Sequence, residues 1–257
     1  MSTNTNTSTN ANTSEAERLA RRLAQQIGCS RNEAQHYIEG GWVTVDGEVV
    51  EEPGRRIAPT QTVNLAAGAK PEPALPVTIL FNKPPGLSTG AAGSPDSSLI
   101  LPSLLPEHRS EADRSGIRPL KKHLAGLRLT DGLETAAAGL LVLTQDWRIA
   151  RRLIDDASRV EQEFIVETAA PVTPWQLALL NQGTRFNGKQ VEDIKASCQS
   201  ENRLRFALKT PARGLLEQLC AQEGLQVLGM RRIRIGRVPL AGLPVGQWCY
   251  LPPWQKF

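Results

Sequence analysis

The segment from Gly132 to Asp146 constrains the fold of this chain more than any other part of its sequence. Within it, Leu140 to Leu143 is a short apolar run, which is typical of a strand buried on both faces. The residues that follow, from Trp147 to Leu153, have the apolar spacing of a helix. A buried strand followed at once by a helix predicts a layered domain that contains both kinds of element.

Length and composition set the outer bounds. The chain has 257 residues, of which 40% are hydrophobic, enough for one large domain and one small one. Its apolar runs are far too short to cross a bilayer and it has no signal-peptide core, so we expect a soluble, cytoplasmic monomer. The cysteines are widely separated, which argues against zinc and redox motifs, and we expect neither a metal nor a cofactor. The four cysteines are Cys29, Cys198, Cys220 and Cys249.

The arginines are more informative than the net charge, which is only +4. In any one arginine cluster the side chains more often lie on an ordinary solvated face, but three clusters on separate elements favour a surface that binds a polyanion. The clusters are Arg18, Arg21, Arg22 and Arg31; Arg148, Arg151 and Arg152; and Arg231, Arg232, Arg234 and Arg237.

Two helices are predicted near the N-terminus. Residues 1–13 are almost wholly Ser, Thr, Asn and Ala, a composition that predicts a disordered tail. From Ser14 onward, apolar residues recur every four positions, at Leu19, Leu23 and Ile27, which predicts an amphipathic helix that Gly28 ends. Ser30 and Glu33 have the spacing of a capping box and predict the start of a second helix, with Ala34, Tyr37 and Ile38 on its inner face.

A hairpin follows these helices. Residues 42–50 alternate apolar and polar side chains around Asp46-Gly47, the signature of a tight turn between two strands. Val63 and Leu65 predict one further short strand.

This order of elements resembles the S4-type RNA-binding domain, a small module first seen in a primary-binding protein of the small ribosomal subunit. The resemblance covers about residues 14–66 and rests on Arg18-Leu19, Ser30-Arg31-x-x-Ala34 and Val43-x-Val45-Asp46-Gly47. It implies a basic face for structured RNA, where an arginine fork can meet two phosphate oxygens. The implied contacts are Arg18, Arg21, Arg22, Arg31 and Asn32. The alternative is that these helices only pack against the next domain.

A linker and a second domain complete the chain. Residues 67–76 are rich in proline and predict a linker, and we assign residues 77–257 to the larger domain. Further strands are predicted at 164–166 and 203–208, helices at 175–180 and 215–222, and a long loop at 88–116.

Three motifs in this domain resemble those of the pseudouridine synthases, in the branch similar to the small-subunit ribosomal RNA enzyme. They are Asn82-Lys83-Pro84-Pro85-Gly86, the segment from Gly132 to Asp146, and the closing run from Gly229 to Trp248. The resemblance implies an α+β fold: the small RNA-binding module, then a mixed, mainly antiparallel sheet covered by helices. It also implies ribosomal or transfer RNA as the partner, with Lys83, Arg232 and Arg234 as further contacts.

The same resemblance assigns the catalytic positions, where this chain departs from the family. Counted back from Gly139, the family's catalytic Asp falls on Glu134 and a neighbouring Arg falls on Gly132. Glu134 is longer by one methylene, and such misplacement can cost about a hundredfold in rate. The family's Tyr falls on Phe164, which can stack on a base but cannot transfer a proton.

A third departure concerns charge. Residues 214–220 replace a family run that holds three arginines, and Glu217 reverses one of those charges. We therefore expect Glu134 to lack cationic partners, since a nearby negative charge disfavours an ionised carboxylate. A competing alignment places Arg128-Leu129-Thr130-Asp131 on the catalytic motif, but it needs an insertion and Thr130 interrupts the triplet.

Three interpretations follow. The favoured one is an RNA-binding protein with impaired or lost isomerisation, because the chemical groups have changed together while the structural motifs remain. The second is an active pseudouridine synthase that uses Glu134. The third, an α+β protein unrelated to RNA, requires both resemblances to be coincidental.

Overall fold

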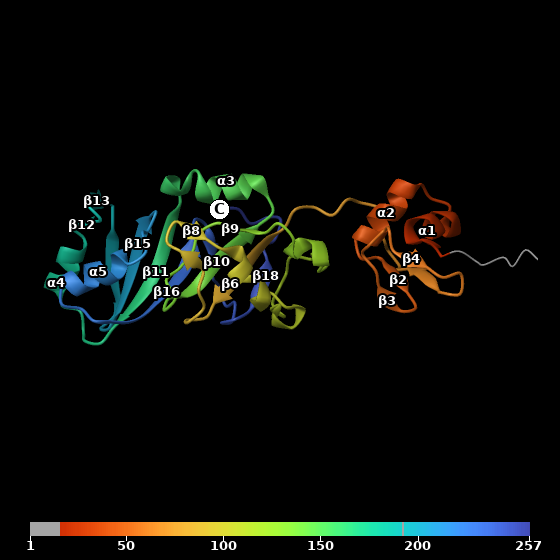
Figure 1. Ribbon diagram of the computed structural model, residues 1–257. Coiled ribbons are helices and arrows are strands. Elements are labelled where there is room, and N and C mark those ends of the chain that lie inside the picture. Colours follow the sequence, from red (N-terminus) through yellow and green to blue (C-terminus); the bar gives the residue numbers. More distant parts are fainter. Residues whose placement is uncertain (1–15, 192) are drawn as a thin grey trace, which may run out of the picture. The chain divides into compact units, whose positions relative to one another are not determined.

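The computed structural model describes residues 16–191 and 193–257. The tail expected at residues 1–13 lies outside these ranges. Contacts within the chain separate it into two compact units, Met1–Leu75 and Pro76–Phe257, and each unit is described by itself (Figure 1).

The first unit packs two helices against short strands. Helix α1 (Leu19–Ile27) ends at Gly28, and α2 (Arg31–Glu39) begins with the predicted capping box between Ser30 and Glu33. The strands form a sheet in the order β3-β2-β5 and a separate pair, β1-β4. Their bounds are β1 Glu17–Arg18, β2 Val43–Val45, β3 Glu48–Val49, β4 Arg56–Ile57 and β5 Val63–Leu65.

The predicted hairpin is β2 and β3. Asp46 and Gly47 both have positive φ, 52° and 88°, as expected for a two-residue turn that matches strand twist. Leu19, Leu23 and Ile38 are completely buried in the small core. Ile27, expected on the same buried face, is instead exposed because it is the last residue of α1.

The second unit is built on a nine-stranded sheet. Its main path runs β14-β15-β11-β16-β10-β6-β18, with β17 beside β16 and β9 beside β10. Among the described strands of this sheet, β10 and β16 pair in parallel and the other pairs are antiparallel, so the predicted α+β fold with a mainly antiparallel sheet is confirmed. The bounds are β6 Thr78–Lys83, β9 Arg128–Leu129, β10 Ala138–Thr144, β11 Glu161–Thr168, β14 Lys195–Ser200, β15 Arg203–Lys209, β16 Val227–Ile235, β17 Val238–Pro239 and β18 Trp248–Tyr250.

Strand β10 is central and contributes to both faces of the sheet. Leu140 and Val142 belong to one hydrophobic cluster, and Leu141 and Leu143 belong to the other. This explains the continuous apolar run in the sequence. Helix α3 (Trp147–Ile154) contributes Leu153 to the first cluster, and α5 (Leu215–Gln222) packs on the second.

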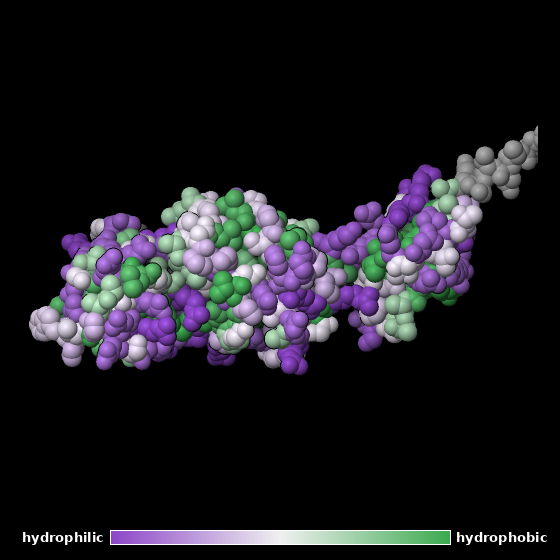
Figure 2. All heavy atoms as spheres, turned by 90° about the horizontal axis from the view of Figure 1, so that it is seen from below, coloured by the Kyte–Doolittle hydropathy of each residue, from purple (hydrophilic) through white to green (hydrophobic). Residues whose placement is uncertain are grey.

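The remaining elements are short. The expected loop at 88–116 holds β7 Gly90–Ala91, β8 Ser94–Pro95, η1 Ser97–Leu99, η2 Leu101–Ser103 and η3 Pro106–His108. Elsewhere lie η4 Lys121–Leu124, η5 Ala157–Arg159, α4 Pro174–Leu180, β12 Thr184–Phe186 and β13 Lys189–Val191. On the face shown in Figure 2, apolar side chains form separate patches among hydrophilic ones. No helix in the described ranges is long and apolar enough to span a membrane.

Candidate active-site groove and RNA-binding surface

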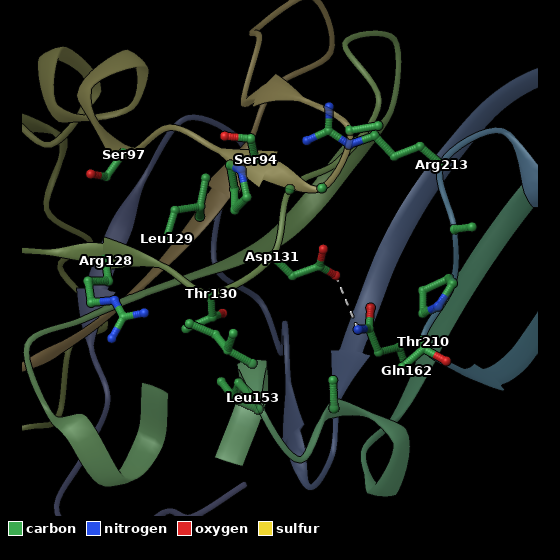
Figure 3. Close-up of a pocket in the computed structure, with 18 of the residues that line it drawn as sticks. Ser94, Ser97, Arg128, Leu129, Thr130, Asp131, Leu153, Gln162, Thr210 and Arg213 are labelled. Atoms are coloured by element: carbon green, nitrogen blue, oxygen red, sulfur yellow. Dashed lines mark hydrogen bonds between the residues drawn. The ribbon is translucent and has the colours of Figure 1, made fainter. Parts of the chain in front are cut away.

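The second unit carries a groove of about 750 Å³ (Figure 3). It is lined by β9 and the residues after it, by the loop at 210–213, and by Leu153 and Ile154 at the end of α3. Gly132, the first residue of the Gly132–Asp146 segment, therefore lines this groove.

Three polar side chains form a network at this groove. Asp131 Oδ2 accepts hydrogen bonds from Arg232 Nη1, at 2.8 Å, and from Gln162 Nε2, at 3.2 Å. Gln162 Oε1 accepts a second bond from Arg232 Nη1, at 2.9 Å. The Asp131 side chain is 40% exposed, whereas that of Arg232 is only 1% exposed. The carboxylate thus faces the groove and the arginine supports it from within the protein.

Arg232 and Lys83 are completely buried, which corrects their expected role as surface contacts for RNA. Arg232 Nε donates to Leu140 O at 2.8 Å. Burial lowers the pKa of Arg232, and the charge of Asp131 opposes that shift. Both cations come from strands that pair with β10, so they are held inside the sheet.

Glu134 has a different environment. Its Oε1 accepts a hydrogen bond from Gly214 N at 2.8 Å. The enclosed space that Glu134 lines, together with Phe164 and Arg232, has a volume of only about 10 Å³. Phe164 is 3% exposed and belongs to the hydrophobic core. The structure therefore brings the two expected catalytic residues together around almost no free volume.

Cations do lie near Glu134, contrary to the expectation from sequence. Burial lowers the pKa of Lys83 to about 8, and the negative charge of Glu134 opposes that change. Lys83 Nζ donates to the carbonyl oxygens of Pro84, Thr135 and Ala137. Glu134 also opposes the lowered pKa of Arg232. Glu217, expected to repel Glu134, is exposed on α5 and does not line the groove. The expectation came from the position of Glu217 in the alignment. The direction of a side chain on a helix depends on the helical repeat, which the alignment does not take into account.

Arg213 fills the space beside Gly132. A Cβ added at Gly132 would lie 1.8 Å from Arg213 Nη2 and 2.6 Å from Thr89 Oγ1. The guanidinium donates to Gly90 O at 2.6 Å and to Thr89 Oγ1 at 2.7 Å. The family's arginine is absent at position 132, but a guanidinium from another loop occupies that volume. The sequence did contain a signal, since Arg213 directly precedes the aligned position 214.

Arg234 is already neutralised by acidic neighbours. It bonds Glu161 at 2.6 Å and also pairs with Glu163, which in turn pairs with Arg205. Glu163 raises the pKa of Arg234 through this hydrogen bond. The expected RNA contact at Arg234 therefore competes with two carboxylates, those of Glu161 and Glu163.

The first unit has a groove of about 700 Å³ with a basic lining. Arg18, Arg21 and Arg31 all line it, and Arg56 joins them. Sequence reasoning missed Arg56, although it follows a Pro-Gly turn next to another arginine. Arg22 does not line this groove and donates to Glu17 at 3.3 Å. Asn32 is exposed but is not part of the lining either.

In the part of the chain that the structure describes, no group of three or more His, Cys, Asp or Glu side chains could hold a metal ion.

Comparison with known proteins agrees with both units. The S4 domain family model matches residues 17–63. The chain is 28% identical to a chloroplastic protein of Arabidopsis thaliana whose name assigns it to the ribosomal large-subunit pseudouridine synthases, over 86% of this chain but only 55% of that protein. It is also 28% identical to an RNA pseudouridine synthase of Aquifex aeolicus, over 90% of this chain and 91% of that one.

Two further similarities complete the comparison. The dual-specificity RNA pseudouridine synthase of Escherichia coli strain K12 is 23% identical over 90% of this chain and 74% of its own length. A crystal structure of a pseudouridylate synthase has the same fold, with a TM-score of 0.56 and 20% identity, covering 91% of this chain and 95% of that one. The resemblance seen in the sequence is thereby confirmed: residues 17–63 match the S4 domain, most of the chain is similar to RNA pseudouridine synthases, and its fold is that of a pseudouridylate synthase.

Proposed function

We propose that this protein binds structured ribosomal or transfer RNA and that its uridine isomerisation is impaired or lost. It would act as a cytoplasmic monomer without metal or cofactor. The basic groove of the first unit supports RNA binding. So do the relatives, whose names describe them as RNA pseudouridine synthases.

One observation carries the proposed loss of isomerisation. The Glu134 carboxylate is bonded to Gly214 N, and the enclosed space beside it is about 10 Å³. A single water needs roughly 10–15 Å³, so a nucleobase has no room there without a rearrangement. Phe164, in addition, has no proton to give or take.

A second candidate function is an active isomerase that uses Glu134. The observation that favours it is the group of cations near the carboxylate, because Lys83 and Arg232 both interact with its charge. Nearby positive charge stabilises an ionised carboxylate, which is the form needed for attack.

Tritium release separates these two functions. The full-length protein is incubated with unmodified ribosomal and transfer RNA that carries tritium at carbon five of uracil. We expect no release above background, from the wild type or from Glu134→Ala. Release by the wild type that Glu134→Ala abolishes, while the exposed control Glu217→Ala retains it, would establish the active isomerase instead.

RNA binding is tested on the same protein. The triple variant Arg18→Ala, Arg21→Ala, Arg31→Ala should bind the RNA more weakly, and its slope of log affinity against log salt should be flatter by about 2 to 3, since each phosphate contact contributes roughly 0.7 to 0.9. Unchanged affinity and slope in the folded variant would contradict a role for this groove.

A further inference from the structure

We propose that one face of helix α3 binds an unpaired stretch of RNA, with a base stacked on Trp147 and phosphates bound by the arginines beside it. This α3 face consists of Trp147, Arg148, Arg151 and Arg152, none of which lines the groove around Asp131. The proposal rests on the RNA binding proposed above and adds to it a second contact surface, on the other unit of the chain.

Helix α3 turns its apolar side chains toward the sheet. Ala150 and Leu153 are buried, and Ile149 packs in the same hydrophobic cluster as Leu153. Figure 1 shows α3 on the outside of the second unit. Trp147 is 65% exposed at the start of the helix, although tryptophan is a residue that proteins bury to a large extent on average. The α3 face therefore presents a large aromatic surface to water.

The arginines of the α3 face are not neutralised by carboxylates. Arg148 lies over the Trp147 ring, with its guanidinium carbon 5.6 Å from the ring centroid. Among the described residues, the side chains of Arg148, Arg151 and Arg152 form no hydrogen bond or ion pair. Arg203, on a strand of the same unit, differs because it bonds Glu167 at 2.6 Å. Three guanidinium groups thus remain able to bind phosphates.

The aspartates near α3 do not pair with these arginines. Asp146 caps the start of the helix, where its Oδ1 accepts from Arg148 N at 2.8 Å. Asp155 and Asp156 follow the last turn, and neither forms an ion pair among the described residues. The helix dipole favours arginines in the last turn, which accounts for two of the three. It does not account for an exposed tryptophan under an arginine at the other end.

This combination of groups fits an unpaired nucleic acid strand. Guanidinium forks bind phosphate oxygens, and an exposed aromatic ring can stack any base, because every base has a flat π-face. The bases of a duplex are already stacked on one another, so a duplex would use the arginines and leave Trp147 in water. The α3 face therefore favours a single strand without selecting its sequence.

The end of α3 reaches the groove of the same unit. Leu153 and Ile154 line that groove, and so does the exposed Arg128. Figure 3 shows Arg128 and Leu153 on the same side of it. An RNA strand that lies on the α3 face can thus continue into the groove along the protein surface.

The test compares two RNA hairpins with the same stem and loop, one of which also carries ten unpaired nucleotides of mixed sequence at each end. Wild-type protein should bind the extended hairpin about thirtyfold more tightly, roughly tenfold of this from one stacked base. Trp147→Ala should reduce the ratio of the two affinities to about threefold, and Trp147→Phe, which keeps a ring, should retain most of it. The matched control Trp175→Ala, at a similarly exposed position on α4, should leave the ratio unchanged.

The arginines are tested by salt titration. The double variant Arg151→Ala, Arg152→Ala should flatten the slope of log affinity against log salt for the extended hairpin by about 1.4, since each phosphate contact on a single strand contributes roughly 0.7. The slope for the hairpin without extensions should not change. Arg203→Ala is the control and should keep the wild-type slope, because Arg203 is 59% exposed but already bonds Glu167.

Both hairpins are measured on each variant, so a smaller folded fraction does not alter the ratio. Equal binding of the two hairpins by the wild type, or an unchanged ratio in Trp147→Ala, would overturn the role of the α3 face while leaving RNA binding by the first unit intact. Failure to bind either hairpin would overturn the proposed function as well.

Discussion

The arginines in the groove of the first unit and three arginines on the sheet of the second unit have opposite environments. In the first unit, Arg18, Arg21 and Arg31 are exposed and line one groove. In the second, Arg205, Arg232 and Arg234 lie on strands of the sheet and each bonds a carboxylate. Similar arginine-rich sequences therefore serve two purposes, a surface that can bind phosphates and a set of internal ion pairs.

The sequence context accounts for this difference. The groove that Arg18, Arg21 and Arg31 line has one acidic residue in its lining, Glu17. Strand β11 instead supplies acids at alternate positions, and its register sets Glu163 opposite Arg234 and Glu167 opposite Arg203. Opposite charges on paired strands stabilise the sheet, so an arginine cluster in a strand predicts internal pairing when an acidic strand is its neighbour.

The largest effect that would separate the two groups is on stability. Arg232→Ala removes the buried partner of Asp131 and the bond to Leu140 O, and it should lower the free energy of unfolding by about 3–5 kcal/mol. Arg31→Ala, in the exposed group, should change it by less than about 0.5 kcal/mol. Urea denaturation of the two variants measures both values. A loss below about 1 kcal/mol for Arg232→Ala would remove the distinction between the units.

A second effect depends on pH and is confined to the second unit. His123 is buried against the Tyr250 hydroxyl, with Nδ1 at 2.9 Å from that oxygen, and burial followed by the charge of Lys122 lowers its pKa from 6.5 to about 4. Between these values the unfolded chain binds a proton that the folded protein excludes. Stability is thus retained above pH 6.5 and lost as the pH falls toward 4, by roughly 3 kcal/mol.

The variant His123→Gln should remove this part of the pH dependence, seen as a flatter plot of unfolding free energy against pH from 4 to 6.5. The exposed His108→Gln serves as the control and should keep the wild-type curve. Parallel curves for wild type and His123→Gln would show that His123 is not held neutral.

The third effect concerns the guanidinium beside Gly132. Gly132→Ala places a Cβ against Arg213 Nη2 and Thr89 Oγ1, which should destabilise the protein by about 1–3 kcal/mol through overpacking. In an Arg213→Ala background the same change should cost at least about 1 kcal/mol less, because most of the clash is gone. A double-mutant cycle by urea denaturation measures this coupling. Additive effects would mean that Arg213 does not occupy the volume beside Gly132.

Much of the fold was predictable because local rules determined it. The capping box at Ser30 and the Asp46-Gly47 turn satisfy backbone requirements within a few residues. The run Leu140–Leu143 is apolar because both faces of β10 are covered. Strand β14, by contrast, was missed because it lies at the sheet edge and is almost wholly exposed, so burial imposes no alternation on its sequence.

The candidate site was harder to predict because its contacts join distant segments. Asp131 meets Arg232 across 101 positions, and Glu134 meets Gly214 across 80. Alignment to family motifs assigns roles by position and cannot represent a guanidinium supplied from a neighbouring loop. Arg213 beside Gly132 is such a case, and so is Lys83, whose burial follows from its place at the end of β6.

The smallest effect distinguishes two neighbouring arginines within the first unit. Arg21 is 60% exposed and lines the basic groove, at the 4.0 Å limit of an ion pair with Glu17. Arg22 is 32% exposed, lies outside the groove, and bonds both Glu17 and Pro59 O.

Arg21→Ala should therefore flatten the salt slope of RNA binding by roughly 0.7 to 0.9 and weaken binding a few-fold, since one phosphate contact is lost. Arg22→Ala should leave the slope within about 0.2 of the wild type, because its charge is already engaged within the unit. Salt titrations with one structured RNA, such as unmodified transfer RNA, measure both slopes. Equal changes for the two variants would mean that RNA meets the whole helix face and not the groove alone.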